Sequence, residues 1–313
     1  QATYAVSASF FQRSVLVHKE VRMKAVKLWG GLGNQLFQYA FARYLSELVK
    51  EEVVFYQMEN EPIKPSLDLF QSGIQIKMLP IQTILNHFLL GGKGLKYRIE
   101  RKALMSFPFL NRDVFVEPSP HYNTEISLHA TLYDGYWQSY KYLEPVEDSI
   151  KASVSWKDIP EKDSETLRQI EGCNSVSLHI RRGDYLNAKN ARIYATCDAN
   201  YYSAAIRQIL ESVEDPVFYI FSNDIRRISV EMEVLKKYPV FYMNHEDEVN
   251  GHVIDFFLMS RCKHNIIANS TFSWWGAWLN RNLGKVVIAP ENWYQGRLNL
   301  TTRDLIPENW IRL

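Results

Sequence analysis

The sequence predicts an α/β protein built on parallel, doubly wound sheets, and two observations carry this prediction. Near the start, a short strand pattern at residues 24–29 is followed by a glycine-rich loop at 30–34, a helical pattern and a second strand pattern at 52–56. In the second half, apolar β-rich runs alternate with helical patterns between residues 176 and 289. Strands that alternate with helices are typical of parallel sheets joined by crossover helices.

The helix after the glycine loop should present one apolar face to the sheet. Its apolar residues recur at helical spacing and are Leu36, Phe37, Ala40, Phe41, Tyr44, Leu45 and Leu48. Residues 57–130 are less regular, and there we expect a short helix at 81–90, a basic helix end at 96–102 and a strand at 126–133.

The second half predicts strands at 176–180, 216–221, 240–243, 265–268 and 285–289, and helices at 201–213, 228–237, 253–261 and 272–280. A polar, proline-containing stretch at 151–163 separates this half from the first. We therefore expect domains at 23–155 and 156–313. Residues 1–22 carry three basic residues against one acid and directly precede Met23, which suggests a leader or an appended extension.

Composition excludes several classes of function. The formal net charge of +1 provides no overall field that would recruit nucleic acid. The three cysteines are widely spaced and form no CxxC pair, which disfavours a zinc knuckle and favours a reducing, cytoplasmic setting. No apolar run reaches the length of a membrane span, and a peripheral contact with a membrane stays open.

The most informative stretch is 176–185, where an alternating apolar run ends in two arginines, a glycine and Asp184. A strand with this ending places fixed cations at the carboxyl edge of a sheet, where open α/β sheets bind ligands. Guanidinium groups donate paired hydrogen bonds that suit phosphate oxygens. His179 and Arg181 should point the same way because strand side chains alternate. The alternative is a surface ion pair between an arginine and Asp184.

Two other segments favour anions. Gly31, Gly33 and Asn34 lie between a strand and a helix, where backbone can approach a ligand and helix N–H groups attract negative charge. Ser270 and Thr271 lie where another strand gives way to a helix. The alternatives are a tight turn at the glycines and ordinary capping of the second helix by one of the two hydroxyls.

Asp255 lies within an otherwise apolar helical run and therefore needs a partner, which could be a guanine edge, Arg261 or Lys263. A mixed aromatic and polar stretch is typical of a sugar subsite, although an aromatic hairpin packed on the core fits equally well; its candidates are Asp134, Tyr136, Trp137 and Gln138. We find no paired acids after a strand that would hold a metal with a diphosphate, and no serine–histidine–acid order.

Together, these residues resemble the α-1,2-fucosyltransferases of glycosyltransferase family 11. The resemblance rests on three stretches in the same order, at 30–39, 179–185 and 269–275, and on smaller matches at 135–138 and 221–224. It extends from about Met23 to the end of the chain.

The resemblance implies a GT-B fold, in which two Rossmann-like domains face a central cleft. The first domain would hold the acceptor, through Asp134, Tyr136, Trp137 and Gln138. The second would hold GDP-β-L-fucose, with the β-phosphate on Arg181 and the guanosine near His179 and Asp255. The remaining donor contacts would come from Gly31, Gly33, Asn34, Ser270 and Thr271.

The implied reaction is metal-independent and needs no cofactor beyond the donor substrate. Fucose would pass, with inversion, to the 2-hydroxyl of a terminal β-galactoside in a glycan. Arg181 would stabilise the leaving group, and Asp184 would be the first candidate for the general base, with Asp134 the second. The alternatives are a fucosyltransferase of another linkage and a non-catalytic protein that binds a sugar nucleotide or a glycan. The expected location is the cytoplasm, with a peripheral contact to the inner membrane left open.

Overall fold

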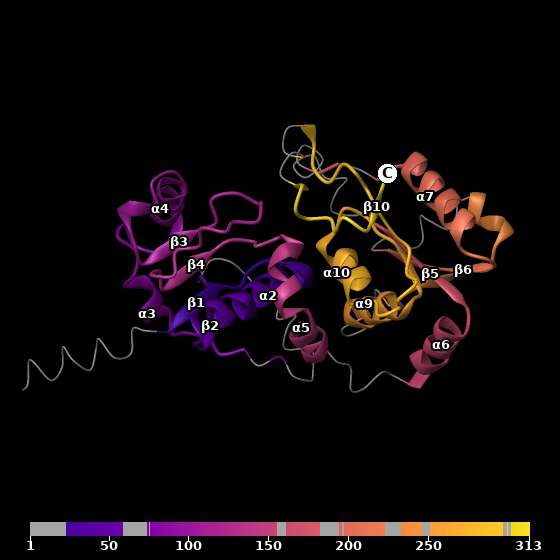
Figure 1. The fold of residues 1–313 in the computed structure, drawn as a ribbon, viewed down its shortest axis with the longest axis horizontal. Helices are drawn as coiled ribbons and strands as arrows, with labels where there is room; N and C mark the ends of the chain where they lie inside the picture. The colour runs from indigo at the N-terminus through magenta and orange to yellow at the C-terminus, as the bar shows by residue number, and fades with distance from the viewer. Residues whose placement is uncertain are drawn as a thin grey trace, which may run out of the picture.

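The computed structural model describes residues 23–58, 74, 76–154, 161–181, 194–195, 197–222, 233–245, 251–296, 299 and 302–313. They form two lobes, each built on a parallel sheet, that lie side by side along the long axis of the molecule (Figure 1). The predicted α/β class with parallel sheets is therefore confirmed. Residues 1–22 and Asp184 lie outside the described residues.

The sheet of the N-terminal lobe has four parallel strands in the order β2-β1-β4-β3. These are β1 (Lys24–Lys27), β2 (Val53–Tyr56), β3 (Val114–Val116) and β4 (Leu132–Asp134). The helices of this lobe are α2 (Leu32–Val49), α3 (Ile81–Leu85), α4 (Gly94–Ser106) and α5 (Glu147–Ser153). Helix α2 connects β1 to β2 and buries the apolar face predicted for it, apart from the exposed Leu48.

The sheet of the C-terminal lobe has six parallel strands in the order β10-β9-β8-β5-β6-β7. They are β5 (Asn174–Ile180), β6 (Pro216–Ser222), β7 (Val240–Met243), β8 (His264–Ile266), β9 (Val287–Ala289) and β10 (Ile311–Arg312). The helices are α6 (Glu161–Gly172), α7 (Ala199–Ser212), α9 (Gly251–Arg261) and α10 (Thr271–Leu279).

Most elements of the second half lie where the sequence predicts them. All five predicted strands are present, and a sixth short strand, β10, was not predicted. Of the helix expected at 228–237, the described part is a 3₁₀ turn at Glu233–Lys237. In the first half the sequence missed β3, and the strand expected at 126–133 is shorter and later, as β4.

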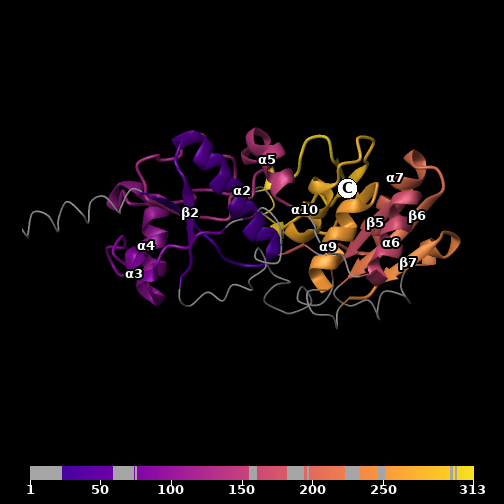
Figure 2. The ribbon, with the colours of Figure 1, turned by 90° about the horizontal axis from the view of Figure 1, so that it is seen from below.

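One large hydrophobic core joins the two lobes. On the N-terminal side Phe37 of α2 contacts two rings of α10, at ring-centroid distances of 4.6 Å to Trp274 and 5.1 Å to Trp275. Both views place α2 against α10 at the centre of the molecule (Figures 1 and 2). The expected domain boundary at 155/156 falls between the strands of the two sheets, and this core crosses from one lobe to the other.

The last residues of the chain also connect the lobes. The Asp304 carboxylate accepts the backbone N–H of Tyr122 at 3.0 Å and lies 2.9 Å from the ammonium of Lys141. The indole N–H of Trp274 donates to the carbonyl of Leu305 at 2.8 Å. Among the described residues, no helix has the length and apolar character needed to cross a membrane.

Gly33 sets how closely α2 approaches α10. A Cβ atom at this position would lie 2.4 Å from the carbonyl carbon of Thr271 and 2.7 Å from the backbone nitrogen of Phe272. Because both are backbone atoms, no side-chain rotation could relieve the overlap. The glycine is therefore required by contact between two helices that belong to different lobes.

Replacing Gly33 with alanine should separate these helices and destabilise the protein by about 1–3 kcal/mol, the usual cost of overpacking. Urea unfolding of Gly33→Ala measures this loss. Gly31→Ala is the matched control, since no atom lies within 4 Å of a Cβ at Gly31 and its backbone is extended. Equal stability of the two variants would contradict the role assigned to Gly33.

Candidate active site

The segments that follow four strands meet between the lobes. Asn34, after β1, accepts hydrogen bonds at its side-chain oxygen from Gln138, after β4, and from Thr271, after β8; the distances are 2.9 and 3.0 Å. These three residues were predicted as site residues from separate parts of the chain. The carboxyl ends of the two sheets thus meet in one region between the lobes, which we call the junction. The carboxyl edge of the sheet is where α/β folds bind ligands.

Arg181, directly after β5, belongs to the same junction. Its guanidinium group donates to the Ser270 hydroxyl at 2.9 Å, and the Arg181 side chain is partly buried. The expectation that Ser270 or Thr271 caps α10 through its hydroxyl is wrong. No side-chain hydrogen bond caps this helix, because one hydroxyl binds Arg181 and the other donates to Asn34. The first N–H groups of α10 therefore lie beside a guanidinium with no side-chain cap over them, which suits an anion.

His179 is buried at the end of β5 and remains neutral. Its side chain is 7% exposed, and Nδ1 has no hydrogen-bond partner within the described part of the chain. Burial, together with the positive charge of Arg181, lowers the pKa of His179 to about 3. A neutral imidazole with an unsatisfied nitrogen can bind a polar group of a ligand without adding charge.

Asp255 of α9 is paired with a histidine. His245 Nδ1 lies 2.6 Å from Asp255 and Nε2 lies 3.1 Å from Asp163 of α6, so the imidazole connects two carboxylates. The two side chains named as alternative partners have other contacts, since Arg261 binds Glu171 and the ammonium of Lys263 lies near Asn174. The hydrogen bond to Asp255 raises the pKa of His245, and the bond to Asp163 adds to the rise.

Asp134 lies beneath the junction in a buried ion cluster. Its side chain is fully buried, accepts a hydrogen bond from Tyr97, and lies 3.7 Å from the Lys27 ammonium and 3.2 Å from the Arg101 guanidinium. Lys27 is also buried, with 1% exposure, and donates to the Tyr97 hydroxyl at 2.5 Å. The two cations fix the buried carboxylate of Asp134, the last residue of β4, and thereby stabilise the start of the turn that follows.

That turn brings one aromatic ring to the surface and buries another. Tyr136 is 37% exposed and stacks on Trp29, with ring centroids 4.2 Å apart. The Lys27 ammonium lies 4.7 Å from the Trp29 ring centroid, on the side of the buried cluster. Trp137 is fully buried against Phe41, at a centroid distance of 3.8 Å, so it packs in the core.

Glu117 holds this turn and was missed in the sequence. Its carboxylate accepts the backbone N–H groups of Tyr136 at 2.7 Å and Trp137 at 3.0 Å. Trp137 has φ of +57°, a left-handed conformation that a side chain rarely adopts unless its surroundings impose it. Burial raises the pKa of Glu117 to about 7, although the two N–H groups act in the opposite direction. The available signal was an acid directly after a short buried strand.

The predicted glycines differ in their environment. Gly31 is exposed at the start of α2, where a ligand could approach. Gly33 is covered by α10, so its contact with a donor stays a prediction. The arrangement as a whole places a cation, a helix start and a neutral histidine in the C-terminal lobe, and a partly exposed aromatic pair in the N-terminal lobe.

Comparison with known proteins assigns this chain to a family. The model of the family described as glycosyl transferase family 11 matches residues 2–313. An alpha-1,2-colitosyltransferase of Escherichia coli is 33% identical over 92% of this chain and 97% of its own. The O-antigen biosynthesis glycosyltransferase WbnK of Escherichia coli is 30% identical over 91% of this chain and 99% of its own. A galactoside 2-alpha-L-fucosyltransferase of Caenorhabditis elegans is 22% identical over 90% of this chain and 77% of its own.

A solved structure supports the GT-B fold, and a second one aligns with a lower score. The structure of a mutant of Arabidopsis thaliana FUT1 in complex with GDP aligns with a TM-score of 0.50 and 12% identity, covering 91% of this chain and 74% of that one. The fucosyltransferase NodZ from Bradyrhizobium aligns with a TM-score of 0.46 and 13% identity, covering 82% of this chain and 92% of that one. The GT-B type expected from the sequence is thereby confirmed.

The bridge made by His245 predicts a pH-dependent contribution to stability. Because its pKa is raised in the folded protein, this contribution is fully present below the unfolded pKa of about 6.5 and is lost as the pH rises through the folded value. His245→Gln should therefore cost more free energy of unfolding at about pH 6 than at about pH 9. Urea unfolding at both pH values measures the difference.

His264→Gln is the matched control with the opposite sign. Burial lowers the pKa of His264, and its Nδ1 accepts the N–H of Val286 at 3.0 Å. The stability that His264 contributes is present above its unfolded pKa and declines as the pH falls, so its replacement should cost more at the higher pH. The same pH trend in both variants would contradict the assignment.

Proposed function

The chain belongs to glycosyl transferase family 11, and from this premise we propose that it transfers L-fucose from GDP-β-L-fucose to the 2-hydroxyl of a terminal β-galactoside, with inversion and without a metal ion. The observation that carries the proposal is the junction itself, where Arg181, Ser270 and the start of α10 face residues of the N-terminal lobe. Glycan acceptors, rather than nucleic acids, are the partners expected for such a site.

The anion-binding side fits a nucleoside diphosphate sugar. Arg181 and the uncapped N–H groups of α10 would bind the β-phosphate, and neutral His179 would accept or donate one hydrogen bond to the nucleotide. Asp255 lies partly buried and is hydrogen-bonded to His245, and its carboxylate would accept hydrogen bonds from the guanine N–H groups.

The reaction would separate charge across the junction. The galactose 2-hydroxyl attacks the anomeric carbon while the bond from that carbon to the GDP oxygen breaks. Positive charge grows on the sugar ring and negative charge on the departing diphosphate. Arg181 and the α10 amides would stabilise the departing charge through preorganised donors, which are effective in a partly buried site.

The proton of the attacking hydroxyl needs an acceptor. Asp184 stays the first candidate from the sequence and lies outside the described residues. Asp134 is disfavoured in this role because its carboxylate is buried among Lys27, Arg101 and Tyr97. A base must come within hydrogen-bond reach of the hydroxyl it serves.

The acceptor side would be the Trp29–Tyr136 pair with Gln138. Flat aromatic rings that keep part of their surface in solvent suit the apolar faces of sugars. Tyr136 satisfies this condition and Trp137 does not, because Trp137 is core. Of the four residues expected to bind acceptor, the structure thus favours Tyr136 and Gln138.

A second donor deserves a direct test because a 33% identical relative carries the name of an alpha-1,2-colitosyltransferase. Colitose is L-fucose without its 3-hydroxyl group. A site that hydrogen-bonds this hydroxyl discriminates strongly against the deoxy sugar, whereas an apolar site discriminates weakly. Competition between GDP-fucose and GDP-colitose, followed by linkage analysis of the product, identifies the donor and the bond formed.

The basic test of the function is incubation with GDP-fucose, with and without lactose, while GDP release is followed. Release that depends on lactose, together with a product fucosylated at the galactose 2-hydroxyl, is the expected result. A product with another linkage would show that the enzyme uses a different acceptor hydroxyl from the one proposed. Absence of turnover together with tight GDP-fucose binding would indicate a binding protein.

Arg181→Ala should lower the rate of transfer by about a hundredfold or more, because it removes a donor to the leaving group. Circular dichroism should show an unchanged fold, since Arg181 lies at the end of a strand and outside the core. Arg207→Ala, on the exposed face of α7, is the control and should be fully active. A well-folded Arg181→Ala enzyme with normal turnover would refute the role.

Tyr136→Ala should raise the KM for the galactoside about tenfold and leave the KM for the donor unchanged, because the ring serves only the acceptor. Initial rates at varied lactose and varied donor separate the two constants. Tyr242→Ala removes an equally exposed tyrosine from β7 and should change neither. A rise in the KM for the donor instead would indicate that Tyr136 contacts the donor and not the acceptor.

A further inference from the structure

Exposed apolar side chains are concentrated on one part of the N-terminal lobe, around α4. Between residues 89 and 110 eight large apolar side chains are at least two-fifths exposed: Leu89, Leu90, Leu95, Ile99, Met105, Phe107, Phe109 and Leu110. The highest values are 71% for Leu95 and 70% for Phe109. Such a concentration marks an interaction surface, whereas single exposed apolar residues do not. We call these eight residues, with the charged residues among them, the α4 surface.

The orientation of α4 is determined by its opposite face. Tyr97 and Leu104 are buried, and the Tyr97 ring packs edge-on against Phe88 at a centroid distance of 5.6 Å. Leu95 and Ile99 are about one helical turn apart and lie on the side of α4 away from that core. Helix α4 therefore exposes apolar residues while a separate apolar face is already packed.

Glu100 makes the α4 surface a rigid unit. Its buried carboxylate accepts the backbone N–H groups of Leu89 at 2.8 Å and Leu90 at 2.9 Å, and the Asn111 amide at 2.9 Å. The loop before α4 and the segment after it are thus tied to the helix through one side chain. These hydrogen bonds keep the exposed apolar residues of the loop in a fixed position relative to α4.

The exposed charges between residues 89 and 112 are all positive, and the exposed Asp113 that follows lies 3.3 Å from His87. The positive residues are Lys93, Lys96, Arg98, Lys102 and Arg112. Glu100, the one acid between residues 89 and 112, is buried, and Arg101 is directed to Asp134. Long basic side chains beside exposed leucine, isoleucine and phenylalanine are the pattern of helices that lie in the interface of an anionic membrane.

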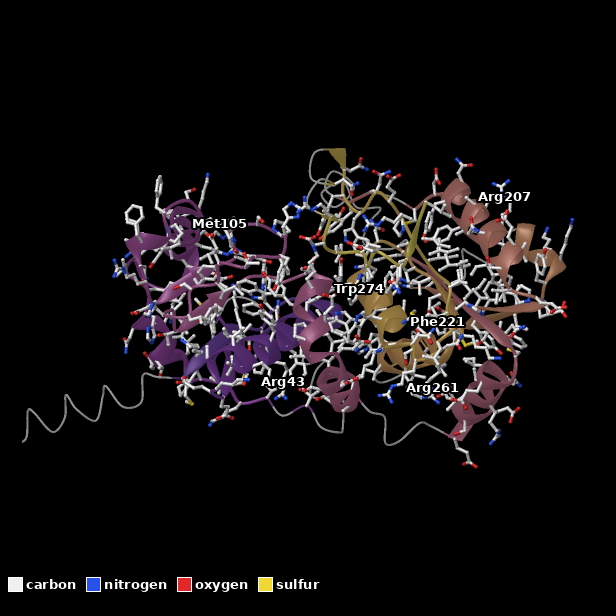
Figure 3. All side chains as sticks on the ribbon, viewed as in Figure 1. Arg43, Met105, Arg207, Phe221, Arg261 and Trp274 are labelled. Atoms are coloured by element: carbon white, nitrogen blue, oxygen red, sulfur yellow. The ribbon has the colours of Figure 1, made fainter. Side chains whose placement is uncertain are left out.

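We propose that the α4 surface binds the face of an anionic phospholipid bilayer. Leu95, Ile99 and Phe109 would enter the boundary between headgroups and acyl chains, and the surrounding lysines and arginines would bind lipid phosphates. A lipid bilayer is favoured over a protein partner because five exposed cations lie among the apolar residues, whereas the exposed acids nearby, Asp113 beside His87 and Glu125, lie at the edge of the surface. The α4 surface lies at the outer end of the N-terminal lobe, far from α10 and from Arg207 (Figures 1 and 3).

Co-sedimentation with phosphatidylglycerol/phosphatidylcholine vesicles tests the proposal, with pure phosphatidylcholine vesicles as the comparison. The full chain should bind the anionic vesicles and much less of it should bind the neutral ones. Leu95→Gln/Ile99→Gln should weaken partitioning about a hundredfold through lost apolar burial. Arg98→Gln/Lys102→Gln should weaken it about tenfold, with less effect at high salt.

The matched controls remove similar residues elsewhere. Leu48→Gln/Leu283→Gln removes two exposed leucines, and Arg207→Gln/Lys237→Gln removes two exposed cations of the C-terminal lobe. Both should bind vesicles as the unaltered chain does. None of these substitutions touches the junction, and vesicle binding needs no turnover, so the result is independent of the proposed transfer reaction.

Three results would overturn the proposal. The first is failure of the unaltered chain to sediment with anionic vesicles, and the second is equal binding by the α4 variants and the controls. The third is self-association in sedimentation velocity that Leu95→Gln/Ile99→Gln abolishes, without vesicle binding. That outcome would make the α4 surface an interface between copies of the chain.

Discussion

The contact between Gly33 and the start of α10 is the constraint on which the rest of the structure depends. Two helices from different lobes approach until backbone meets backbone, and the position has no room for a single methyl group. Phe37 extends the contact by packing on Trp274 and Trp275. Since interiors of this density are nearly incompressible, the spacing of the lobes follows from this crossing.

The polar junction is a consequence of that spacing. Once α2 and α10 touch, Asn34 comes within hydrogen-bond reach of Thr271 and Gln138 at once. The hydroxyls that would ordinarily cap α10 are drawn into contacts between segments, and the amides at the helix start are left without a side-chain cap. A tight apolar contact thus supports a candidate ligand site to which both lobes contribute.

Charge is distributed unequally across the junction. Among the described residues on the side of β5, the imidazole is neutral and the Arg181 guanidinium supplies positive charge, which suits an anionic ligand. On the side of β4 the cations are already paired with Asp134 below the surface. The aromatic pair of Trp29 and Tyr136 above them reaches solvent, which suits a neutral sugar. The C-terminal side of the junction therefore suits an anion, and the N-terminal side suits a neutral sugar.

The sequence predicted the C-terminal sheet well because its strands are continuous apolar runs, buried on both faces, between clear helical patterns. It predicted the N-terminal lobe less well because β3 and β4 have three residues each, too few to show a period. The sequence singled out residues of the junction where they follow a strand, as with Arg181 and Ser270. Partnerships such as Asp255 with His245 could not be found, since contacts between segments distant in the chain leave no local signal.

Helix α4 shows why composition alone misled at 96–102. Its lysines and arginines suggested a basic helix end, whereas the structure has a helix over Gly94–Ser106 with one buried and one exposed apolar face. Tyr97 and Arg101 reach inward to Asp134, directly beneath the turn that carries Tyr136. Leu95 and Ile99 face outward. A membrane held against the outer face would lie on the lobe that we assign to the acceptor, so one helix would connect the bilayer to the sugar-binding turn through a single buried carboxylate.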